Sequence, residues 1–419
     1  MVIGREKAEG YLGTSEVREL VLTALERTDL DNRRVLLILP DLTRNAPVPL
    51  LFRLLADALT PRVKKLDAII ALGTPRPLAV EQIAERIGVT STELAGRYRG
   101  MSFFNHAYDR PEQLAEIGAL AADEVREISG GLLSEEAVVT VNKRVFDYDH
   151  LIAISPVVPH EVAGFSGGNK YLFPGIAGAD FIHFFHWLAA VITNLALNGI
   201  KDNPVRRILD RAASFISIPR LFLNLVIHQG RIRGLFIGDD EEAWGRAADL
   251  SSKVHIRYID RAYDRVLGVA PPYYDDLWVA GKVMYKLEPV IADGGELIIF
   301  APHISEISYT HGPLLRKIGY HVRDYYLAQM ERFAHIPRGV LAHSTHVKGA
   351  GTYRAGLEQP RVKVVLATAI PEDVCRLVNL GYCDHRTIEV EEWRNRENEG
   401  VLLVEKAGEV LYRLQPSCT

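Results

Sequence analysis

Unbroken apolar runs alternate with helical periodicity through the first part of the chain. The run Val35–Leu39 has no polar position, which is typical of a strand buried on both faces of a parallel sheet. Leucines recur at helical spacing over Val48–Leu59, and a second apolar run follows at Ala68–Leu72. This order predicts a βαβ unit and therefore an α/β fold.

The same alternation continues to the end of the chain and restarts once. Helical patterns at residues 79–87 and 91–98 precede short strand candidates at 138–141, 151–154, 221–227 and 232–237. From Val266 a new series begins, with a strand at 266–269, a helix over 277–291, strands at 297–300 and 362–366, and a final hairpin of 401–404 with 410–414. We expect two α/β domains with largely parallel sheets, residues 1–262 and 263–419, with the last strands as candidates to return to the first domain.

Composition and charge exclude several classes of protein. The 49 Lys and Arg residues against 53 Asp and Glu leave a net charge of −4, so no basic field favours nucleic acid. The chain starts without a basic stretch leading into an apolar run, and nowhere do about eighteen apolar residues follow one another. Cys375, Cys383 and Cys418 form no C-x-x-C pair. We expect a cytoplasmic protein without a membrane partner, a disulfide framework or a thiolate zinc site.

The loop after the first buried strand carries candidate ligand-binding side chains. Ligands of open α/β sheets bind beyond the carboxyl ends of the strands. There the chain reads Pro40 to Pro47, with Asp41, Thr43 and Arg44, and a guanidinium suits a phosphate or carboxylate. The alternative is a helix cap by Asp41 or Thr43. The loop after the second strand adds Arg76, which either binds the same anion or pairs with a surface acid such as Glu81.

A glycine-rich interval in the middle of the chain holds further candidates. It contains His160, Lys170, and the pair His183 and His186, spaced to share one helix face. It matches neither a Walker sequence nor a G-x-S-x-G elbow. Lysine there can bind phosphate, form a Schiff base or attach a cofactor, and either histidine of the pair can bind metal. For each histidine, including His106 among its aromatic neighbours, a structural hydrogen-bonded role is the alternative.

Taken together, these residues resemble the nickel-pincer-nucleotide-dependent lactate racemase family over nearly the whole chain. The resemblance is carried by Asp-x-Thr-Arg at 41–44, Gly-x-x-Arg-Pro at 73–77, a histidine at 106, and the segment 160–170, which reads HEVAGFSGGNK and continues through FPGIA to residue 186. It implies that the cofactor lies in a cleft between the two domains. It also implies that His106 and His160 are the acid–base residues, that Lys170 carries the cofactor covalently and that His186 binds the nickel. The cofactor would be contacted by Asp41, Thr43, Arg44, Gly167 and Gly168. The substrate would be contacted by Arg44, Lys282 and Trp278.

The family resemblance also implies the chemistry. The α-hydrogen of a 2-hydroxy acid is too weakly acidic for simple abstraction, so it leaves as a hydride to the cofactor while a histidine takes the hydroxyl proton. A 2-keto acid forms, and return of the hydride in the opposite geometry gives the other enantiomer. Short-chain aliphatic 2-hydroxy acids are the expected substrates, and cofactor-synthesis enzymes are the expected partners.

The chain departs from the family pattern in its second half. Lactate racemases carry a Gln and a Lys three residues apart on a helix, and the matching positions here are Val279 and Lys282, beside Trp278. The lost amide favours a pocket for a larger or more apolar side chain. The loop Pro302–Ser308 is a second possible substrate determinant, or an ordinary surface turn. Two other functions stay open. One is a protein of this fold that binds the cofactor or a nucleotide without catalysing a reaction, and the other is a metal-dependent hydrolase built on His183 and His186.

Overall fold

The computed structural model of the chain describes residues 2–74, 76–238 and 241–415. These residues form two compact units. The first contains the chain up to Pro159 together with Phe165–Ile182 and Lys201–Val254. The second contains His160–Gly164, His183–Ile200 and the chain from His255 onward. The expected boundary at residue 262 is close to the start of this last stretch, but two short segments of the glycine-rich interval also belong to the second unit.

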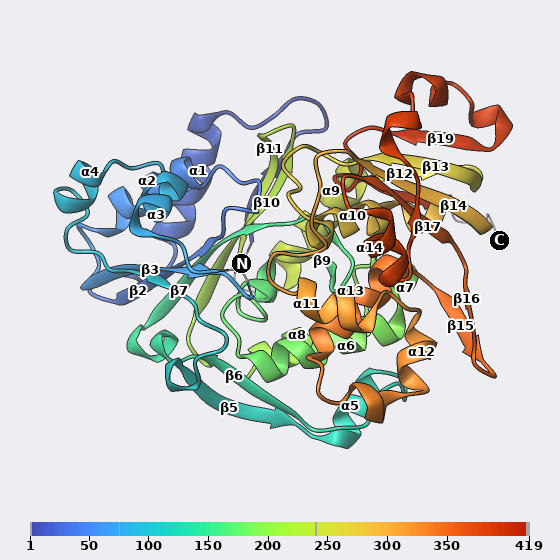
Figure 1. Cartoon of the computed structure of the whole chain (residues 1–419). Coiled ribbons are helices and arrows are strands. Elements are labelled where there is room, and N and C mark those ends of the chain that lie inside the picture. The colour runs from blue at the N-terminus through green and yellow to red at the C-terminus, as the bar shows by residue number, and fades with distance from the viewer. Residues whose placement is uncertain (1, 75, 239–240, 416–419) are drawn as a thin grey trace. The chain divides into compact units, whose positions relative to one another are not determined.

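A seven-stranded sheet forms the centre of the first unit (Figure 1). Its order is β1-β11-β10-β7-β2-β3-β4, and the five strands from β10 to β4 are parallel, while β11 runs antiparallel to both of its neighbours. The strands are β1 (Ile3–Glu6), β2 (Arg34–Pro40), β3 (Lys65–Ala71), β4 (Phe103–Asn105), β7 (His150–Pro156), β10 (Arg220–His228) and β11 (Arg231–Gly238).

Helices on one face of this sheet build the main core of the first unit. They are α1 (Thr14–Glu26), α2 (Val48–Leu59), α3 (Val80–Ile87) and α4 (Ser91–Ala95). The leucines predicted for the helix at residues 48–59 pack against alternate residues of the sheet strands, and all except the partly buried Leu50 are buried. Phe52 is fully buried, with its ring 5.3 Å from that of Tyr98 and 6.0 Å from that of Phe103. Its replacement by alanine would cost about 3–5 kcal/mol.

The strand expected at 138–141 lies outside this sheet. It is β6 (Ala137–Asn142), and it pairs antiparallel with β5 (Leu114–Leu120) in a separate ribbon. The predicted strand is confirmed, and its partner is a new observation, because apolar alternation predicts a strand but not what it pairs with. The remaining elements around the glycine-rich interval are α5 (Ala122–Ile128), β8 (Pro159–His160), β9 (Gly164–Phe165), α6 (Ala179–Ile192), α7 (Asn194–Leu197), α8 (Pro204–Ala213), α9 (Glu241–His255), η1 (Pro111–Gln113), η2 (Lys143–Asp147) and η3 (Gly168–Tyr171).

The second unit contains an all-parallel five-stranded sheet of order β18-β17-β14-β13-β19. Its strands are β13 (Tyr263–Val269), β14 (Ile291–Ala301), β17 (Lys363–Thr368), β18 (Gly381–Tyr382) and β19 (Val401–Val404). Its helices are α10 (Leu277–Leu287), α11 (Gly312–Ile318), α12 (Arg323–Leu327), α13 (Arg338–Lys348), α14 (Glu372–Leu377), η4 (Glu288–Val290), η5 (Met330–Phe333), η6 (His385–Thr387), η7 (Val390–Trp393) and η8 (Glu397–Glu399). The small ribbon of β15 (Gly351–Arg354) and β16 (Leu357–Pro360) is antiparallel. The predicted α/β fold with largely parallel sheets is confirmed.

The last two strands do not form the expected hairpin. β19 joins the five-stranded sheet beside β13, whereas β20 (Leu411–Leu414) pairs in parallel with β12 (Ile256–Ile259). Both partners belong to the second unit. The turn that contains Gly408, whose φ is +100°, therefore connects strands of two different sheets. Among the residues that the structure describes, no helix has the length and apolar character needed to cross a membrane.

Candidate active site

The loop after β2 in the first unit is held by its own polar side chains. Asp41 Oδ1 accepts a hydrogen bond from the backbone N–H of Thr43 at 2.7 Å and another from its hydroxyl at 2.5 Å. The next helix, α2, has Pro47 at its N-cap and no side-chain cap. The alternative in which Asp41 or Thr43 caps that helix is therefore wrong. The two side chains shape the loop itself in an Asx-type turn.

Arg86 of α3 secures the same loop from outside. Its guanidinium donates to the carbonyl oxygens of Pro40 at 3.0 Å and Arg44 at 2.8 Å. Burial lowers the pKa of Arg86, and the neighbouring charge of Asp41 opposes that shift. Burial raises the pKa of Tyr171, on which Arg44, Asp41 and Arg86 all act electrostatically. The Asp41–Arg44 loop and the segment after Lys170 are thus neighbours in the first unit.

Strand β3 also ends near the glycine-rich segment that follows Lys170. The backbone N–H of Gly73 donates to the carbonyl oxygen of Gly175 at 3.0 Å. Arg76 is exposed, and Pro75 of the same predicted motif lies outside the described residues. The loops after β2 and β3 therefore both meet the glycine-rich segment, as the geometry of a parallel sheet predicts.

Lys170 is buried on η3, directly after a backbone that only glycine can form. Gly167 and Gly168 have φ values of +84° and +59°. A Cβ on Gly167 would lie 2.5 Å from Val157 Cγ2, and one on Gly168 would lie 3.0 Å from the Trp244 ring. Both glycines are thus required by conformation and by close approach.

Three buried side chains fix this loop through its backbone. Ser155 Oγ accepts from the N–H of Gly168 at 2.7 Å. The guanidinium of Arg206 donates to the carbonyl oxygens of Phe165, at 2.6 Å, and of Gly167, at 3.3 and 3.4 Å, and it lies 3.9 Å from the Trp244 ring. The indole N–H of Trp244 donates to Ser166. The backbone leading into Lys170 is therefore held rigidly from three directions.

His106, also in the first unit, is 1% exposed, and both of its ring nitrogens bond to the protein. Nε2 lies 2.8 Å from the carbonyl oxygen of Ala177, and Nδ1 lies 3.2 Å from the side-chain amide nitrogen of Asn142. A carbonyl only accepts and an amide NH₂ only donates, so the ring is neutral with its proton on Nε2. Burial lowers the pKa of His106 to about 4. In this conformation neither nitrogen is presented to a substrate.

His160 belongs to the second unit and has an acidic neighbour. Its Nδ1 lies 3.4 Å from the Glu161 carboxylate and 3.1 Å from the backbone nitrogen of Val162, which donates to it. The His160 side chain is 10% exposed and that of Glu161 is 20% exposed. The His160 ring is thus largely buried, with its Nδ1 held by the backbone of Val162 and close to an acid.

The two histidines of α6 share one face, as their spacing predicts. From Phe181 to Val191 all residues are buried except His183 and His186, which are partly exposed. No three His, Cys, Asp or Glu side chains within residues 2–74, 76–238 and 241–415 are grouped so that they could hold a metal ion. Within these ranges, His183 and His186 are therefore not part of a group of three such side chains that a hydrolase metal centre would need.

Trp278 and Lys282 lie one turn apart on the partly exposed face of α10, with Val279 beside them. The Trp278 ring stacks on His343 at 3.8 Å between centroids and lies 4.6 Å from the His311 ring. The Lys282 amine lies 5.2 Å above the Tyr274 ring. Trp278 is thus held between two imidazoles.

The loop at Pro302–Ser308 anchors the start of this helix. The carbonyl oxygens of Glu306 and Ile307 accept from the N–H groups of Leu277 and Trp278, each at 3.0 Å. The loop is therefore more than an ordinary surface turn, because its backbone places Trp278. Its direct contact with a substrate stays a prediction.

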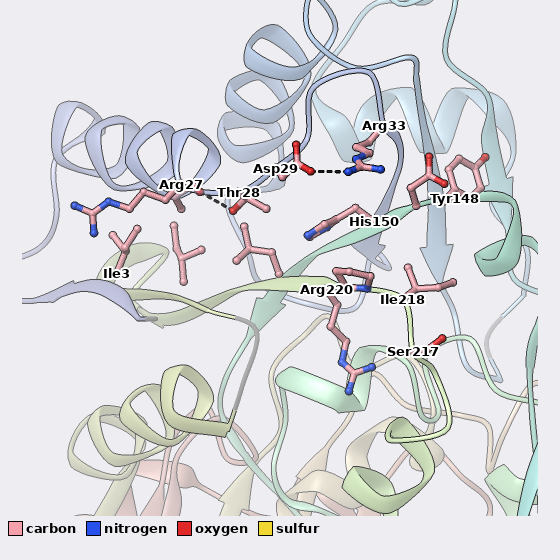
Figure 2. A pocket seen from close by; sticks show the side chains of 15 residues that line it. Ile3, Arg27, Thr28, Asp29, Arg33, Tyr148, His150, Ser217, Ile218 and Arg220 are labelled. Atoms are coloured by element: carbon pink, nitrogen blue, oxygen red, sulfur yellow. Dashed lines mark hydrogen bonds and ion pairs between the residues drawn. The ribbon is translucent and has the colours of Figure 1, made fainter.

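A hollow of about 730 Å³ in the first unit lies elsewhere (Figure 2). It opens at the amino ends of β2, β7 and β10, around His150. Arg33 on its rim pairs with Asp29 at 2.6 Å, and Arg220 donates to the carbonyl oxygens of Ala213 and Ile216. Because its position is at the opposite ends of the strands from the loops above, we do not assign it to the candidate active site.

Comparison with known proteins gives consistent results. The model of the lactate racemase N-terminal domain matches residues 19–197. A lactate racemase of Thermoanaerobacterium thermosaccharolyticum is 27% identical over 313 residues, which are 71% of this chain and 68% of that protein. A lactate racemase of Lactiplantibacillus plantarum is 26% identical over 292 residues, 66% of this chain and 62% of that protein. The chain belongs to the lactate racemase family.

Solved structures extend the similarity of this lactate racemase family member over the whole chain. A crystal structure of a Thermotoga maritima protein has a TM-score of 0.86 and 35% identity, and the match covers 98% of this chain and 100% of that one. The lactate racemase apoprotein of T. thermosaccharolyticum has a TM-score of 0.72 and 19% identity over 95% and 93% of the two chains, which shows the shared fold.

The matched family domain contains some predicted site residues and leaves out others. Residues 19–197 contain the Asp41–Arg44 loop, His106, His160, Lys170 and His186, but neither Trp278 nor Lys282. Sequence reasoning missed the residues that hold this site: Arg86, Asn142, Glu161, Arg206, His311 and His343. Only Glu161 had a detectable signal, since it adjoins His160 in the sequence.

Proposed function

We propose that this chain is a racemase or epimerase of α-hydroxy acids, with lactate and other short aliphatic 2-hydroxy acids as its substrates. The observation that carries the proposal is its membership of the lactate racemase family, with a family domain that spans both Lys170 and His186. The buried lysine on a rigid glycine loop, near the Asp41–Arg44 loop with its guanidinium, supports an attached anionic cofactor.

The residues fit a nickel-pincer nucleotide by their chemistry. Lys170 provides an amine for covalent attachment, and the imidazole of His186 is a donor that nickel accepts. Since the described residues offer no set of three metal ligands, the remaining donors would come from the nucleotide itself. Asp41, Thr43 and Arg44, with the backbone of Gly167 and Gly168, would contact its phosphate end. When bound, this cofactor would supply a hydride acceptor for the substrate's α-hydrogen.

The chain's own residues would then bind the substrate and move its hydroxyl proton. Arg44 and Lys282 would hold the carboxylate, and His160 would take the proton from the hydroxyl group. Trp278, held between two imidazoles, and Val279 would flank the substrate side chain. An apolar side chain larger than methyl would suit this pair better than a polar one.

The role of His106 as the second acid–base residue stays a prediction with a structural condition. Its ring is bonded to Asn142 and Ala177 on its two nitrogens. To exchange a proton with substrate, the ring must give up one of these hydrogen bonds. The two-base mechanism predicts that His106→Gln and His160→Gln each lose racemisation, and full activity of both variants would contradict it.

Racemisation by the loaded protein tests the proposal. The chain would be produced together with the cofactor-synthesis enzymes and incubated with single enantiomers of lactate, 2-hydroxybutyrate and 2-hydroxyisovalerate, each followed by chiral chromatography. We expect interconversion of at least one acid by the wild type and none by Lys170→Ala. A protein that retains nickel but neither racemises nor exchanges the α-deuterium of any acid would instead be a binding protein.

A further inference from the structure

Trp278, the predicted substrate contact on α10, is stacked on a buried imidazole of α13. The ring of His343 lies against the indole with 3.8 Å between the ring centroids and 21° between the ring planes. His343 is 6% exposed, whereas Trp278 is partly exposed. The orientation of an accessible indole is therefore set by a residue that is itself shielded from solvent.

Tyr285 of α10 is the polar anchor of that imidazole. Its hydroxyl oxygen lies 2.8 Å from His343 Nδ1, and its ring meets the imidazole edge to face. The other ring nitrogen of His343, Nε2, is buried and has no hydrogen-bond partner within the part of the chain that the structure describes. The hydrogen bond between Tyr285 and Nδ1 therefore fixes the rotation of the His343 ring under the indole.

A glycine on α10 leaves room for the Tyr285 hydroxyl. A Cβ on Gly281 would lie 2.8 Å from that hydroxyl oxygen and 2.9 Å from Val347 Cγ2 of α13. Tyr285 follows Gly281 by four residues and Trp278 by seven, so all three lie on one side of the helix. Glycine is a poor helix former, and here it stands where Tyr285 needs the space. The contact of Tyr285 with His343 therefore depends on the close packing of α10 on α13.

The imidazoles beside the indole are uncharged. Burial lowers the pKa of His343 well below its usual range, and the charges of His346 and His311 act in the same direction. Burial also lowers the pKa of His311, whose ring lies 4.6 Å from the indole. Trp278 is therefore packed between two neutral rings, an environment that suits an apolar side chain of a ligand better than a charged one.

We propose that Tyr285 and His343 are positioning residues that hold the Trp278 indole in one orientation. Held in this way, the indole selects 2-hydroxy acids whose apolar side chain is larger than methyl over lactate. The inference rests on the proposed function, in which Trp278 flanks the substrate side chain. A fixed indole contacts the larger side chain without a further cost in ordering, whereas a mobile indole must first be ordered. One methylene in an apolar pocket changes kcat/KM by about 10–200-fold, so partial loss of this contact should change the selectivity by about tenfold.

The first test observes the indole directly and needs no cofactor. The full chain is labelled with 5-fluorotryptophan, and the ¹⁹F resonance of Trp278, one of four tryptophans, is assigned from a Trp278→Phe sample. Tyr285→Phe should shift and broaden this resonance and leave the other three in place, because the His343 ring loses its anchor. The double variant Tyr285→Phe with His343→Phe removes both polar partners but keeps both rings, so it should restore a single sharp resonance.

Tyr320→Phe is the matched control. The Tyr320 ring also meets that of His343, with 5.9 Å between centroids. Its hydroxyl is buried but has no hydrogen-bond partner among the described residues. Loss of this hydroxyl should therefore leave the Trp278 resonance where it is in the wild type.

The second test compares two substrates on the cofactor-loaded enzyme. Tyr285→Phe should lower the ratio of kcat/KM for 2-hydroxyisovalerate to kcat/KM for lactate by about tenfold, mainly through a higher KM for the larger acid. The double variant should recover most of this ratio, and Tyr320→Phe should keep it. A Trp278 resonance that does not move in Tyr285→Phe overturns the inference, as does an unchanged ratio. If the resonance moves but the loaded wild type racemises neither acid, the proposed function and its selectivity fail, while the positioning of Trp278 is supported.

Discussion

The most direct structural prediction concerns Arg206, the buried guanidinium that holds the loop before Lys170. We consider Arg206→Met, which keeps much of the side-chain volume but removes every donor. The variant leaves the carbonyl oxygens of Phe165 and Gly167 without their present partner and removes the stacking on Trp244. Arg207 is the matched control, because it adjoins Arg206 on α8 but forms an exposed ion pair with Asp202.

The size of the effect follows from these contacts. A hydrogen bond from a charged donor contributes about 1.5–3 kcal/mol to stability. In the variant, the carbonyl groups of Phe165 and Gly167 each lose such a bond. Stacking over Trp244 adds about 0.5–2 kcal/mol. Relief from burying the guanidinium charge offsets part of this sum, so we expect Arg206→Met to lower the free energy of unfolding by about 3 kcal/mol. The exposed pair of Arg207 should contribute less than about 1 kcal/mol.

Two measurements check this estimate. Urea unfolding followed by circular dichroism gives the stability of both variants. Hydrogen exchange with mass spectrometry reports opening of residues 164–171, which should be on the order of 100-fold faster in Arg206→Met than in Arg207→Met. Equal stability and equal exchange in the two variants would refute the claim that Arg206 holds the loop.

Two further predictions concern the same unit. Gly167→Ala should lower the free energy of unfolding by about 3 kcal/mol, because a Cβ there meets Val157 Cγ2 at 2.5 Å in addition to the unfavourable positive φ. Gly130→Ala is the control, since Gly130 has a φ of +66° but no atom within 4 Å, and it should lower this free energy by about 1 kcal/mol. Thermal unfolding compares the two variants, and equal losses of stability would contradict the role of the close contact. His106, with its pKa lowered to about 4 from 6.5, binds its proton more weakly in the folded chain than in the unfolded one, so its contribution makes stability fall as the pH drops from 6.5 toward 4. By pH 5 this loss should be about 2 kcal/mol relative to pH 7. His106→Gln should therefore show a shallower pH dependence in urea unfolding than the exposed control His335→Gln, and identical slopes would contradict the assigned burial effect.

The elements that could be predicted from sequence are those whose pattern is local. The βαβ unit at the start of the chain is of this kind, since Val35–Leu39 and Ala68–Leu72 are buried runs at the bounds expected of strands. The partner of a strand is a non-local choice, so the pattern could not assign β6 to its ribbon or β20 to β12. The same limit explains why a hairpin was expected at the end of the chain.

The candidate site divides in the same way. Residues joined by spacing could be found, such as Lys170 on its glycine loop and the shared face of His183 and His186. Residues that support them from distant elements could not, and Arg206 is an example because it reaches the loop from α8. The environment of His106 was equally hidden, since Asn142 and Ala177 meet it only in the fold.

Under the proposed function, Lys170 carries the cofactor of this lactate racemase family member. The most direct measurement is the intact mass of the denatured chain after production with the cofactor-synthesis enzymes, with Lys170→Ala and the buried Lys286→Ala of α10 as comparison variants. We expect an adduct of nucleotide size on the wild type and on Lys286→Ala, and none on Lys170→Ala. An unmodified wild type without bound nickel, or an adduct that persists in Lys170→Ala, would contradict it.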